Sequence, residues 1–496
     1  MLDLAHIPVL VVLFPLLMAA VCALLPFRNI AWLLATASTG MGLLAAWTGL
    51  EAHSGERVSY ALGGWPPPWG IEFVADGASL LVSTVVSGLS FISTIYAKSL
   101  IEKEIDEHLI GKAYAAWLLA VGGIQGIVMT GDAFNLFVFL EISSLATVTL
   151  ISLGGRQDRR ALIAAYNYLV IGAIGATFYV IGVGFCYAVT GTLNMADLMV
   201  RLPDATATAP LLVGFSFMVA GILVKAAVFP VHIWLPAAYG YAPSAVSTML
   251  AAVATKASIY VLARIAFTIF DGLDDMVFLI LEFVLLPLSV MAIFVGTILA
   301  IMESDLKKLL AQSSIAQIGY ITLGFSLGNV LGVTAGFVHI VNHALIKGGL
   351  FMAAGALTVV MARRVSIDSL AGMGRAMPIT SSAMMICGLS LIGLPLTAGF
   401  ISKVYLVLAL VSSASWWIIG LVVMSSALSL IYLWRIVEAM WMQPMPASGR
   451  VREDPLIYTP LWVIALINIW FGVDAGRVFR FAEQAAIAVG AGAVSY

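Results

Sequence analysis

The sequence predicts an all-α, polytopic membrane protein, and its composition and patterning support this class. Of the 496 residues, 62% are hydrophobic and only 10% are charged, whereas a soluble domain carries roughly 25% charged residues. The mean hydropathy is +1.06. Apolar runs of about 20 residues recur from one end of the chain to the other, and each is long enough to cross roughly 30 Å of hydrocarbon.

A helix-length hydropathy window predicts about fourteen spanning segments. The first begins MLDLAHIPVLVVLF, which has no basic start and is followed by no small-residue cleavage site, so we expect a helix rather than a cleaved signal. The longest connection, around 51–71, contains WPPPWG, a proline-rich aromatic loop suited to the membrane interface. The segments are expected near 7–26, 30–50, 72–97, 112–130, 132–153, 160–190, 208–230, 241–268, 275–301, 308–327, 331–361, 378–411, 415–443 and 456–476.

Loop charges predict the orientation. The only basic residues in the even-numbered connections are Arg57 and Arg201, although Arg477 and Arg480 follow the last segment. Because cytoplasmic loops carry the excess of Lys and Arg, we expect the odd connections inside a bacterial inner (plasma) membrane and both termini on its extracytoplasmic side. The odd connections carry Arg28, Lys98, Lys103, Lys112, Arg156, Arg159, Arg160, Lys307, Lys308, Arg363, Arg364, Arg375, Arg450 and Arg452.

Proline and glycine interrupt several segments. Pro230 and Pro236 end the seventh, Pro287 lies in the ninth, and Gly393 and Pro395 lie in the twelfth. Broken helices are tolerated where they are buried in protein or line a wet cavity, and their occurrence in two halves suggests inverted repeats around a midplane path. Since the seventh and twelfth segments are five apart, two five-helix repeats fit. We expect helices 1–3 in 1–111, the first repeat in 112–270, the second in 271–445, and the last helix and tail in 446–496.

Four lysines lie within apolar segments: Lys225, Lys256, Lys347 and Lys403. A lysine near the bilayer centre costs a few kcal/mol and usually marks an ion or proton path. The alternative is a side chain that extends from near a helix end to the interface. Lys256 lies thirteen residues beyond Pro243, roughly 20 Å along a helix, which is too deep for that explanation.

One acidic residue, Glu141, matches these lysines in depth. It follows Asp132 by nine residues in GDAFNLFVFLEIS, which places it about 13 Å below the interface. A nearby lysine would favour the charged form of both groups, so we expect Glu141 to pair with Lys225 and the pair to load and release a proton. A neutral Glu141 that hydrogen-bonds between packed helices is the alternative.

The eleventh segment carries His339, His343 and Lys347 at successive i, i+4 positions. This spacing puts all three on one helix face over about 12 Å. Because histidine exchanges protons near neutral pH, the stripe predicts a proton wire. The two histidines also have the spacing of a metal pair, but no third ligand and no HExxH glutamate is evident, so we expect no metal.

Other polar residues carry less information. His232 lies between two prolines of the seventh segment, where a broken helix would admit water, and is assigned to the path. The run EKEIDEH at 102–108 is expected to be a solvated loop or surface helix. The three scattered cysteines, Cys22, Cys186 and Cys387, make neither an iron–sulfur site nor a disulfide framework. We therefore expect no cofactor and no catalytic site of the chain's own.

Several stretches resemble one known family. GDAFNLFVFLE, LVKAAVFPVHIWLPAAYGYAPSAVSTMLAAVATK, SDLKKLLAQSSIAQIGYI, HIVNHALIKGGLF and GLPLTAGFISK are similar to the proton-translocating antiporter-like family. That family includes the A and D subunits of Mrp antiporters, the large antiporter-like subunits of complex I and subunits of membrane-bound hydrogenases. The resemblance covers roughly 70–440. It implies fourteen helices, two inverted five-helix repeats, and discontinuous seventh and twelfth helices.

The resemblance also implies residue roles. A lysine at 403 is similar to the Mrp D subunit and the N-type subunit of complex I, whereas the M-type subunit has a glutamate there. Together with GDAFNLFVFLEIS and the length of the chain, this favours the D subunit of an Mrp-type Na⁺/H⁺ antiporter. By motif, Glu141 and Lys225 match the acid–lysine pair, Lys256 the lysine of the eighth helix, His339, His343 and Lys347 the central groups, and Lys403 the terminal group.

The expected function is therefore that of a proton-translocating subunit in a multisubunit monovalent cation (Na⁺)/H⁺ antiporter. Its partners would be other integral-membrane subunits, the lipid bilayer, protons and Na⁺; no basic stripe indicates nucleic acid. The alternative is a proton-pumping subunit of complex I or a membrane-bound hydrogenase. A scaffolding subunit and a carrier of small organic solutes are further alternatives.

Overall fold

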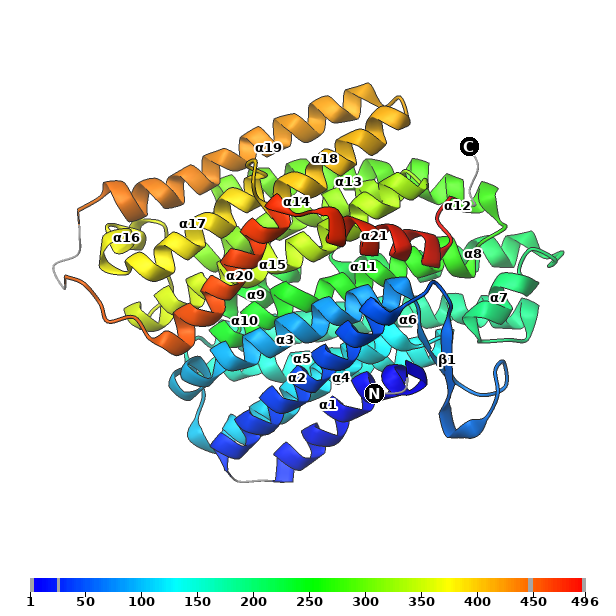
Figure 1. Cartoon of the computed structure of the whole chain (residues 1–496), viewed down its shortest axis with the longest axis horizontal. Helices are drawn as coiled ribbons and strands as arrows, with labels where there is room; N and C mark the ends of the chain where they lie inside the picture. Colours follow the sequence, from blue (N-terminus) through cyan, green and yellow to red (C-terminus); the bar gives the residue numbers. More distant parts are fainter. Residues whose placement is uncertain (1–3, 25–26, 445–448, 493–496) are drawn as a thin grey trace.

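The computed structural model describes residues 4–24, 27–444 and 449–492, which form an almost entirely helical bundle (Figure 1). Twelve of the described helices are long and apolar enough to cross a membrane, or thirteen if one bent pair is counted as a span. The bent pair includes α17, and when the twelve are counted with α14 and the broken α17–α18 pair, the sum among the described residues is consistent with the predicted fourteen. The chain termini and the predicted boundary at 445–446 lie outside the described residues, and the division into repeats stays a prediction.

The first half of the chain contains a small hairpin besides its helices. Its elements are η1 (Leu4–His6), α1 (Ile7–Leu24), α2 (Arg28–Ala52), β1 (Val58–Ala61), η2 (Leu62–Gly64), β2 (Glu72–Ala75), α3 (Gly77–Glu104), η3 (Glu107–Leu109), α4 (Ile110–Met129), α5 (Ala133–Ser152), η4 (Leu153–Arg156), α6 (Arg160–Thr190), α7 (Met195–Arg201), α8 (Thr208–Ala226), α9 (Leu235–Tyr241), α10 (Ser244–Met249), η5 (Leu250–Ala254), α11 (Thr255–Arg264) and η6 (Ile265–Ile269).

The second half is helical throughout, with one long central helix. Its elements are α12 (Asp274–Ile280), η7 (Leu281–Leu285), α13 (Leu286–Met302), α14 (Leu306–Ser326), α15 (Val330–Met361), η8 (Asp368–Leu370), α16 (Met373–Ala376), α17 (Pro378–Ile392), α18 (Ala398–Ser412), α19 (Trp416–Val437), η9 (Glu438–Met442), α20 (Pro455–Val473) and α21 (Gly476–Val489). Of the η elements, η5, η6, η7 and η9 are π-helical and the others are 3₁₀ turns.

The long helix α15 forms the centre of the bundle. It packs against α14, α17, α18, α20 and α21 from the second half and against α3 and α10 from the first. Almost every residue from its start to Thr358 is buried. An apolar helix surrounded on all sides is expected to carry no polar group without a reason, which makes its two histidines and its lysine informative.

The two predicted breaks are present. Helix α8 ends at Ala226, and the next residue, Ala227, takes a left-handed conformation. The Val224 carbonyl, in the last turn, accepts a 3.0 Å hydrogen bond from the indole of Trp234. Helix α17 ends at Ile392, and the next residue, Gly393, has φ 90°, where glycine has no steric penalty. Pro287, by contrast, does not break the ninth segment. It lies in the first turn of α13, where proline is tolerated, and π-helical η7 keeps the segment continuous.

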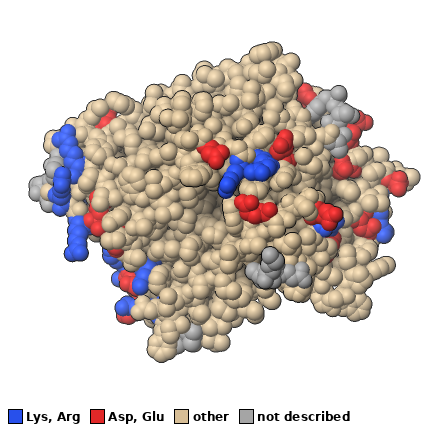
Figure 2. All heavy atoms as spheres, viewed as in Figure 1, with Lys and Arg blue, Asp and Glu red and all other residues tan. Residues whose placement is uncertain are grey.

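Two elements at the chain's periphery were not predicted. The connection around 51–71 forms an antiparallel hairpin in which Val58 pairs with Ala75, with Trp65 and Trp69 exposed at its tip. The C-terminal tail forms the amphipathic helix α21, which lies along α3 and α15 (Figure 1). Figure 2 shows many Lys and Arg side chains at the left end of the molecule, the end of α16 and the α19–α20 connection in Figure 1.

A buried ion pair joins α3, α11 and α21 at the opposite end. Arg264 donates through Nη2 to the carboxylate of Asp76, the N-cap of α3, and both side chains are 9% exposed. Burial alone would raise the pKa of the Asp76 carboxyl, but the Arg264 charge and hydrogen bonds outweigh it and hold that pKa below its usual value. Thr268 adds a 2.8 Å hydrogen bond to the Val489 carbonyl of α21.

Arg264→Met is expected to destabilise the protein by about 3–5 kcal/mol, because it leaves a buried carboxylate without its partner. Thermal unfolding of the purified protein in detergent measures this. Arg201→Met is the matched control, since the Arg201–Asp197 pair is half exposed and such pairs contribute about 0–1 kcal/mol. Equal losses in the two variants would contradict a stabilising role for the buried pair.

Candidate functional site

The first titratable pair lies between α5 and α8. Lys225, in the last turn of α8, donates a 2.6 Å hydrogen bond through Nζ to Ser144 Oγ and lies 3.6 Å from Glu141 Oε1. The Lys225 side chain is 7% exposed and that of Glu141 is 30% exposed. The predicted partners are thus within ion-pair distance, at the break that ends α8. The negative end of a helix dipole also favours a cation at this position.

Aromatic residues connect this pair to the eighth segment. The Trp234 ring lies edge-on between Tyr168 and Tyr239, at centroid distances of 4.9 and 6.5 Å. The Tyr239 hydroxyl donates a 3.1 Å hydrogen bond to the Leu250 carbonyl of η5. The three aromatic rings are therefore in contact one after another, and the last of them is hydrogen-bonded to the eighth segment.

Lys256 is fully buried at the start of α11. Its ammonium donates to the carbonyl of Ala251, within the π-helical turn η5. A π turn changes the backbone pairing of a helix and occurs often at functional sites. The local geometry thus gives Lys256 a main-chain acceptor on its own helix, although the surrounding sequence is apolar.

The predicted histidine stripe faces α14 and α18. His339 lies 2.8 Å through Nδ1 from Ser402 Oγ and 3.0 Å through Nε2 from Gln317 Oε1. The His343 ring stacks on that of His339 at 6.2 Å with an interplanar angle of 10°. Among the described residues, His343 has no hydrogen-bond partner on either ring nitrogen, although it is 1% exposed. A buried imidazole without a structural hydrogen bond is unusual for a packing residue.

The last two lysines are held by helix carbonyls. Lys347 Nζ donates to the Leu310 carbonyl at 2.9 Å and to Ser313 Oγ, both on α14. Lys403 Nζ donates to the Ile392 carbonyl at 2.6 Å and to Ser426 Oγ at 3.0 Å. Ile392 ends α17, so Lys403 satisfies a carbonyl that the broken helix leaves without a partner. As at Lys225, a lysine meets the C-terminal end of an interrupted helix.

The structure brings the central and terminal groups together. Ser402, which contacts His339, immediately precedes Lys403, and the Lys403 ammonium lies 5.0 Å from the Tyr320 ring centre, while Tyr320 and His339 are in edge-on contact at 5.8 Å. His232 is different. It lies in the α8–α9 break with its ring stacked on Phe229 at 5.4 Å, and its described contacts do not join it to the other residues of the line.

The sequence analysis missed a second polar group, near the end of the bundle where the loops predicted to be cytoplasmic lie. The run 102–108 was expected to be solvated, but Glu104 is 2% exposed and accepts from the Ser244 amide at 2.5 Å and its hydroxyl at 2.6 Å. Lys307 donates to Ser244 Oγ at 2.9 Å. The expectation is wrong for Glu104, because helix α3 continues to this residue, which lies four residues beyond the buried Leu100 on the same face. That spacing was visible in the sequence. Glu102, Lys103, Glu107 and His108 are exposed, as expected.

No group of three His, Cys, Asp or Glu side chains within the described ranges could hold a metal ion. The arrangement instead consists of single titratable groups, each next to a hydroxyl, a carbonyl or an aromatic ring. Such groups can take up and release protons one at a time.

Comparison with known proteins assigns the family. Residues 130–429 match the family described as NADH:quinone oxidoreductase/Mrp antiporter, transmembrane, and this range is more than half of the chain. The chain belongs to this family.

Two curated relatives in the NADH:quinone oxidoreductase/Mrp antiporter family are subunits of different complexes. The N subunit of NADH-quinone oxidoreductase from Desulforudis audaxviator is 41% identical over 461 residues, which is 91% of this chain and 90% of that protein. The D subunit of the Na⁺/H⁺ antiporter from Bacillus subtilis is 30% identical over 486 residues, 96% of each chain. The predicted kinship with D subunits is confirmed, and N subunits are relatives as well.

Solved structures of large complexes show the same fold. A chain of the Mrp complex from Dietzia sp. DQ12-45-1b superposes with a TM-score of 0.90 at 26% identity, covering 98% of this chain and 97% of that chain. A chain of an archaeal membrane-bound sulfane sulfur reductase superposes with a TM-score of 0.89 at 30% identity, with 98% of each covered. These neighbours confirm a polytopic membrane subunit of the predicted fold.

Proposed function

We propose that this chain is the proton-translocating subunit of a multisubunit monovalent cation (Na⁺)/H⁺ antiporter in a bacterial plasma membrane. The observation that carries the proposal is the set of four lysines buried at membrane depth, each with polar partners and none in the loops. Placing such charges in an apolar bundle is costly, and titratable groups at that depth mark ion or proton paths. Two findings support the antiporter assignment: the relative that is a Na⁺/H⁺ antiporter subunit and the structural neighbour from an Mrp complex.

In the proposed mechanism, protons move along the line rather than straight across the chain. Protonation of Glu141 weakens its attraction for Lys225 and favours release of the lysine's proton. Lys256, His343 and Lys347 then act as the next stations. Each change of charge shifts the proton affinity of the neighbouring station, and this coupling is large where water is sparse.

The terminal part of the line leads through His339 to Lys403. Ser402 and Gln317 orient the His339 ring, and Lys403 receives the proton next to the α17 break. Interrupted helices beside wet cavities are where membrane transporters place such sites. Other membrane subunits are the proposed partners, and they would exchange this proton flow for Na⁺. Both termini are proposed to lie on the extracytoplasmic side.

A redox-driven pump is the second candidate. The relative at 41% identity is a subunit of a quinone reductase, and one structural neighbour belongs to a sulfur reductase. In such a complex the same line would move protons, but electron transfer in other subunits would drive it.

Na⁺/H⁺ exchange by the whole complex distinguishes the antiporter from the redox-driven pump. The gene is expressed with its neighbours in a sodium-sensitive bacterium that lacks its own antiporters, and everted vesicles are assayed for Na⁺-dependent proton movement. Na⁺/H⁺ exchange without any electron donor is the expected result. A fully assembled complex that shows no exchange, but moves protons on addition of an electron donor, would overturn the antiporter assignment.

A further inference from the structure

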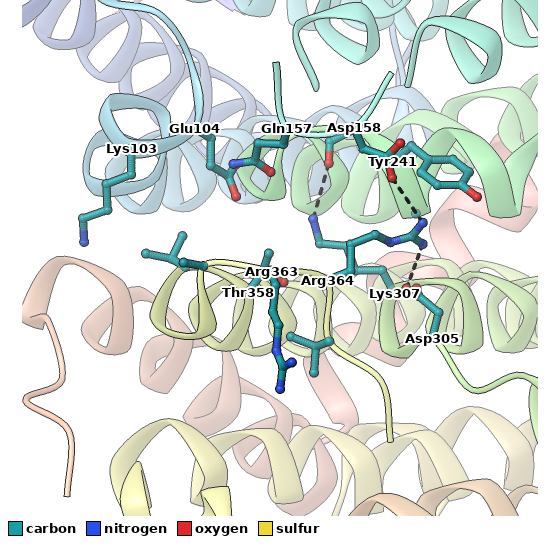
Figure 3. Close-up of a pocket in the computed structure, with 15 residues that line it drawn as sticks. Lys103, Glu104, Gln157, Asp158, Tyr241, Asp305, Lys307, Thr358, Arg363 and Arg364 are labelled. Atoms are coloured by element: carbon teal, nitrogen blue, oxygen red, sulfur yellow. Dashed lines mark hydrogen bonds and ion pairs between the residues drawn. The ribbon is translucent and has the colours of Figure 1, made fainter. Parts of the chain in front are cut away.

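An apolar groove lies beside the amphipathic helix α21. Its volume is about 380 Å³, and it is lined by α2, α3, α15, α20 and α21. It differs from the cleft at the opposite end of the bundle, where Arg364 lies between Asp158 and Asp305 at 3.6 and 2.7 Å (Figure 3). Charged side chains form much of that cleft, whereas apolar side chains form nearly all of the groove.

The groove has a buried floor and exposed edges. Leu81 and Leu89 of α3 and Leu345 of α15 line it and are 5, 3 and 7% exposed. Trp47 of α2 and Trp470 of α20 also line it, but they are 42 and 62% exposed. An apolar ligand in the groove would therefore contact side chains that lipid of the surrounding bilayer barely touches.

The length of the groove matches one leaflet of a bilayer. On α3 its lining begins at Leu81 and ends at Ile92, eleven residues later, which is about 16 Å of helix rise. The hydrocarbon core of a bilayer is about 30 Å thick, so each leaflet contributes about 15 Å. An acyl chain that begins at the membrane surface near Leu81 would thus end near the midplane.

The two charged residues of the groove lie at one end, in the turn between α20 and α21. They are Asp474 and Arg477, and the start of α3 lies at the same end, because Gly77 is in contact with Gln484 of α21. Both charged side chains are exposed, and neither has an ion-pair partner within the described part of the chain. Figure 2 shows a small charged group on a largely uncharged face, in the region that α21 occupies in Figure 1.

The groove also reaches the helix that carries the central titratable groups. Val341 and Leu345 of α15 line it, and each is two residues from His343. Two residues correspond to about 200° around a helix, so the groove contacts the face of α15 opposite to His339, His343 and Lys347. A molecule in the groove would support this helix from behind.

We propose that the groove binds one phosphatidylethanolamine molecule of the extracytoplasmic leaflet. An acyl chain lies along α3 and α15, the phosphate contacts Arg477, and the ammonium contacts Asp474. A guanidinium suits phosphate oxygens because it presents several N–H donors, and a primary ammonium has three N–H donors for a carboxylate. The headgroup of phosphatidylglycerol has no cation for Asp474, and the trimethylammonium of phosphatidylcholine has no N–H to donate.

A segment of a partner subunit is the other possible occupant. The lipid is favoured because the groove is as long as one leaflet and because its charges, one of each sign, lie only at the membrane surface. Groups of opposite charge that do not pair with each other are complementary to a zwitterion. The lipid site goes beyond the proposed proton path and does not depend on it.

Photochemical labelling of the assembled complex tests the proposal. The purified complex is reconstituted in phosphatidylglycerol vesicles with a small fraction of phosphatidylethanolamine that carries a diazirine at the end of one acyl chain. After irradiation, mass spectrometry of peptides locates the adducts. We expect adducts on the floor of the groove, around Leu89 and Leu345. Phosphatidylcholine and phosphatidylglycerol with the same acyl chain should give about fivefold fewer adducts there, the scale of one charged contact near a membrane surface.

Variants of the headgroup contacts provide the second arm. Arg477→Gln and Asp474→Asn are each expected to lower floor labelling by phosphatidylethanolamine about fivefold. Arg480→Gln is the matched control, because Arg480 is also exposed on α21 but does not line the groove. Its labelling should equal that of the wild type.

Gly88→Leu tests the groove itself. Gly88 lines it, and a Cβ added there meets no atom closer than Leu43 Cδ1 at 3.4 Å. The leucine should therefore fill the groove without disturbing α3, so that floor labelling is lost while the thermal unfolding temperature does not fall.

Four results would overturn the proposal. They are equal floor labelling by the three lipids, unchanged labelling in both Arg477→Gln and Asp474→Asn, labelling retained in a folded Gly88→Leu, and a wild-type complex with no adduct on the floor. The last result would show that a partner subunit fills the groove.

Discussion

Lys225→Met is expected to abolish proton transport while the complex still assembles. Methionine matches the length of lysine but cannot carry a proton, and losing an essential proton carrier costs about 100-fold or more in rate. Lys225 is the group next to both Glu141 and Ser144, so the substitution removes the connection between the acid and the rest of the line. Proton uptake by everted vesicles measures the rate.

Stability should fall little in this variant, because Glu141, the partner left behind, is 30% exposed and can contact water or take up a proton. The amount of complex in the membrane therefore serves as a direct check. Lys98→Met is the matched control. Lys98 lies near the membrane interface, 4.1 Å from the centre of the Trp32 ring, and its loss should leave transport within about twofold of wild type. Normal transport by Lys225→Met would remove the pair from the mechanism.

Lys347→Met is expected to have an equally large effect, about 100-fold or more, since the proposed line passes through this ammonium. Lys347 is fully buried on α15 and donates hydrogen bonds to the Leu310 carbonyl and to Ser313 Oγ. The measurement is again proton uptake by vesicles that contain equal amounts of complex.

Lys347→Arg separates charge from proton transfer. Arginine keeps the positive charge at this position, but it does not release its proton in proteins. The relay therefore predicts that Lys347→Arg is as inactive as Lys347→Met. A variant with arginine that transports at the wild-type rate would show that Lys347 only supplies charge.

Most of the architecture could be predicted from the sequence, because the membrane imposes simple rules. Helix length, apolar composition and loop charge gave the segments, and proline and glycine located the breaks at α8 and α17. The buried lysines were identifiable since nothing in an apolar segment justifies them except function. Pro287 shows the limit of this reasoning, because a proline in the first helical turn breaks nothing.

What the sequence did not reveal depends on contacts between distant segments. The π turn η5 beside Lys256 has no residue signature, and the Glu104–Ser244–Lys307 group joins three segments that are far apart in the chain. The burial of Glu104 was also hard to recognise because its neighbours are charged, which is typical of a solvated loop. Helix α21 carries enough charge to resemble a loop, although one face of it packs on α3 and α15.

The central claim is that the Glu141–Lys225 pair and Lys403 belong to one connected path. Proton transport by Lys225→Met, Lys403→Met and the double variant tests it, in vesicles with equal amounts of assembled complex. Stations in series predict that each single variant is as inactive as the double variant. Two independent paths predict instead that each single variant keeps a substantial part of the wild-type rate and that only the double variant is inactive, and this result would contradict the relay.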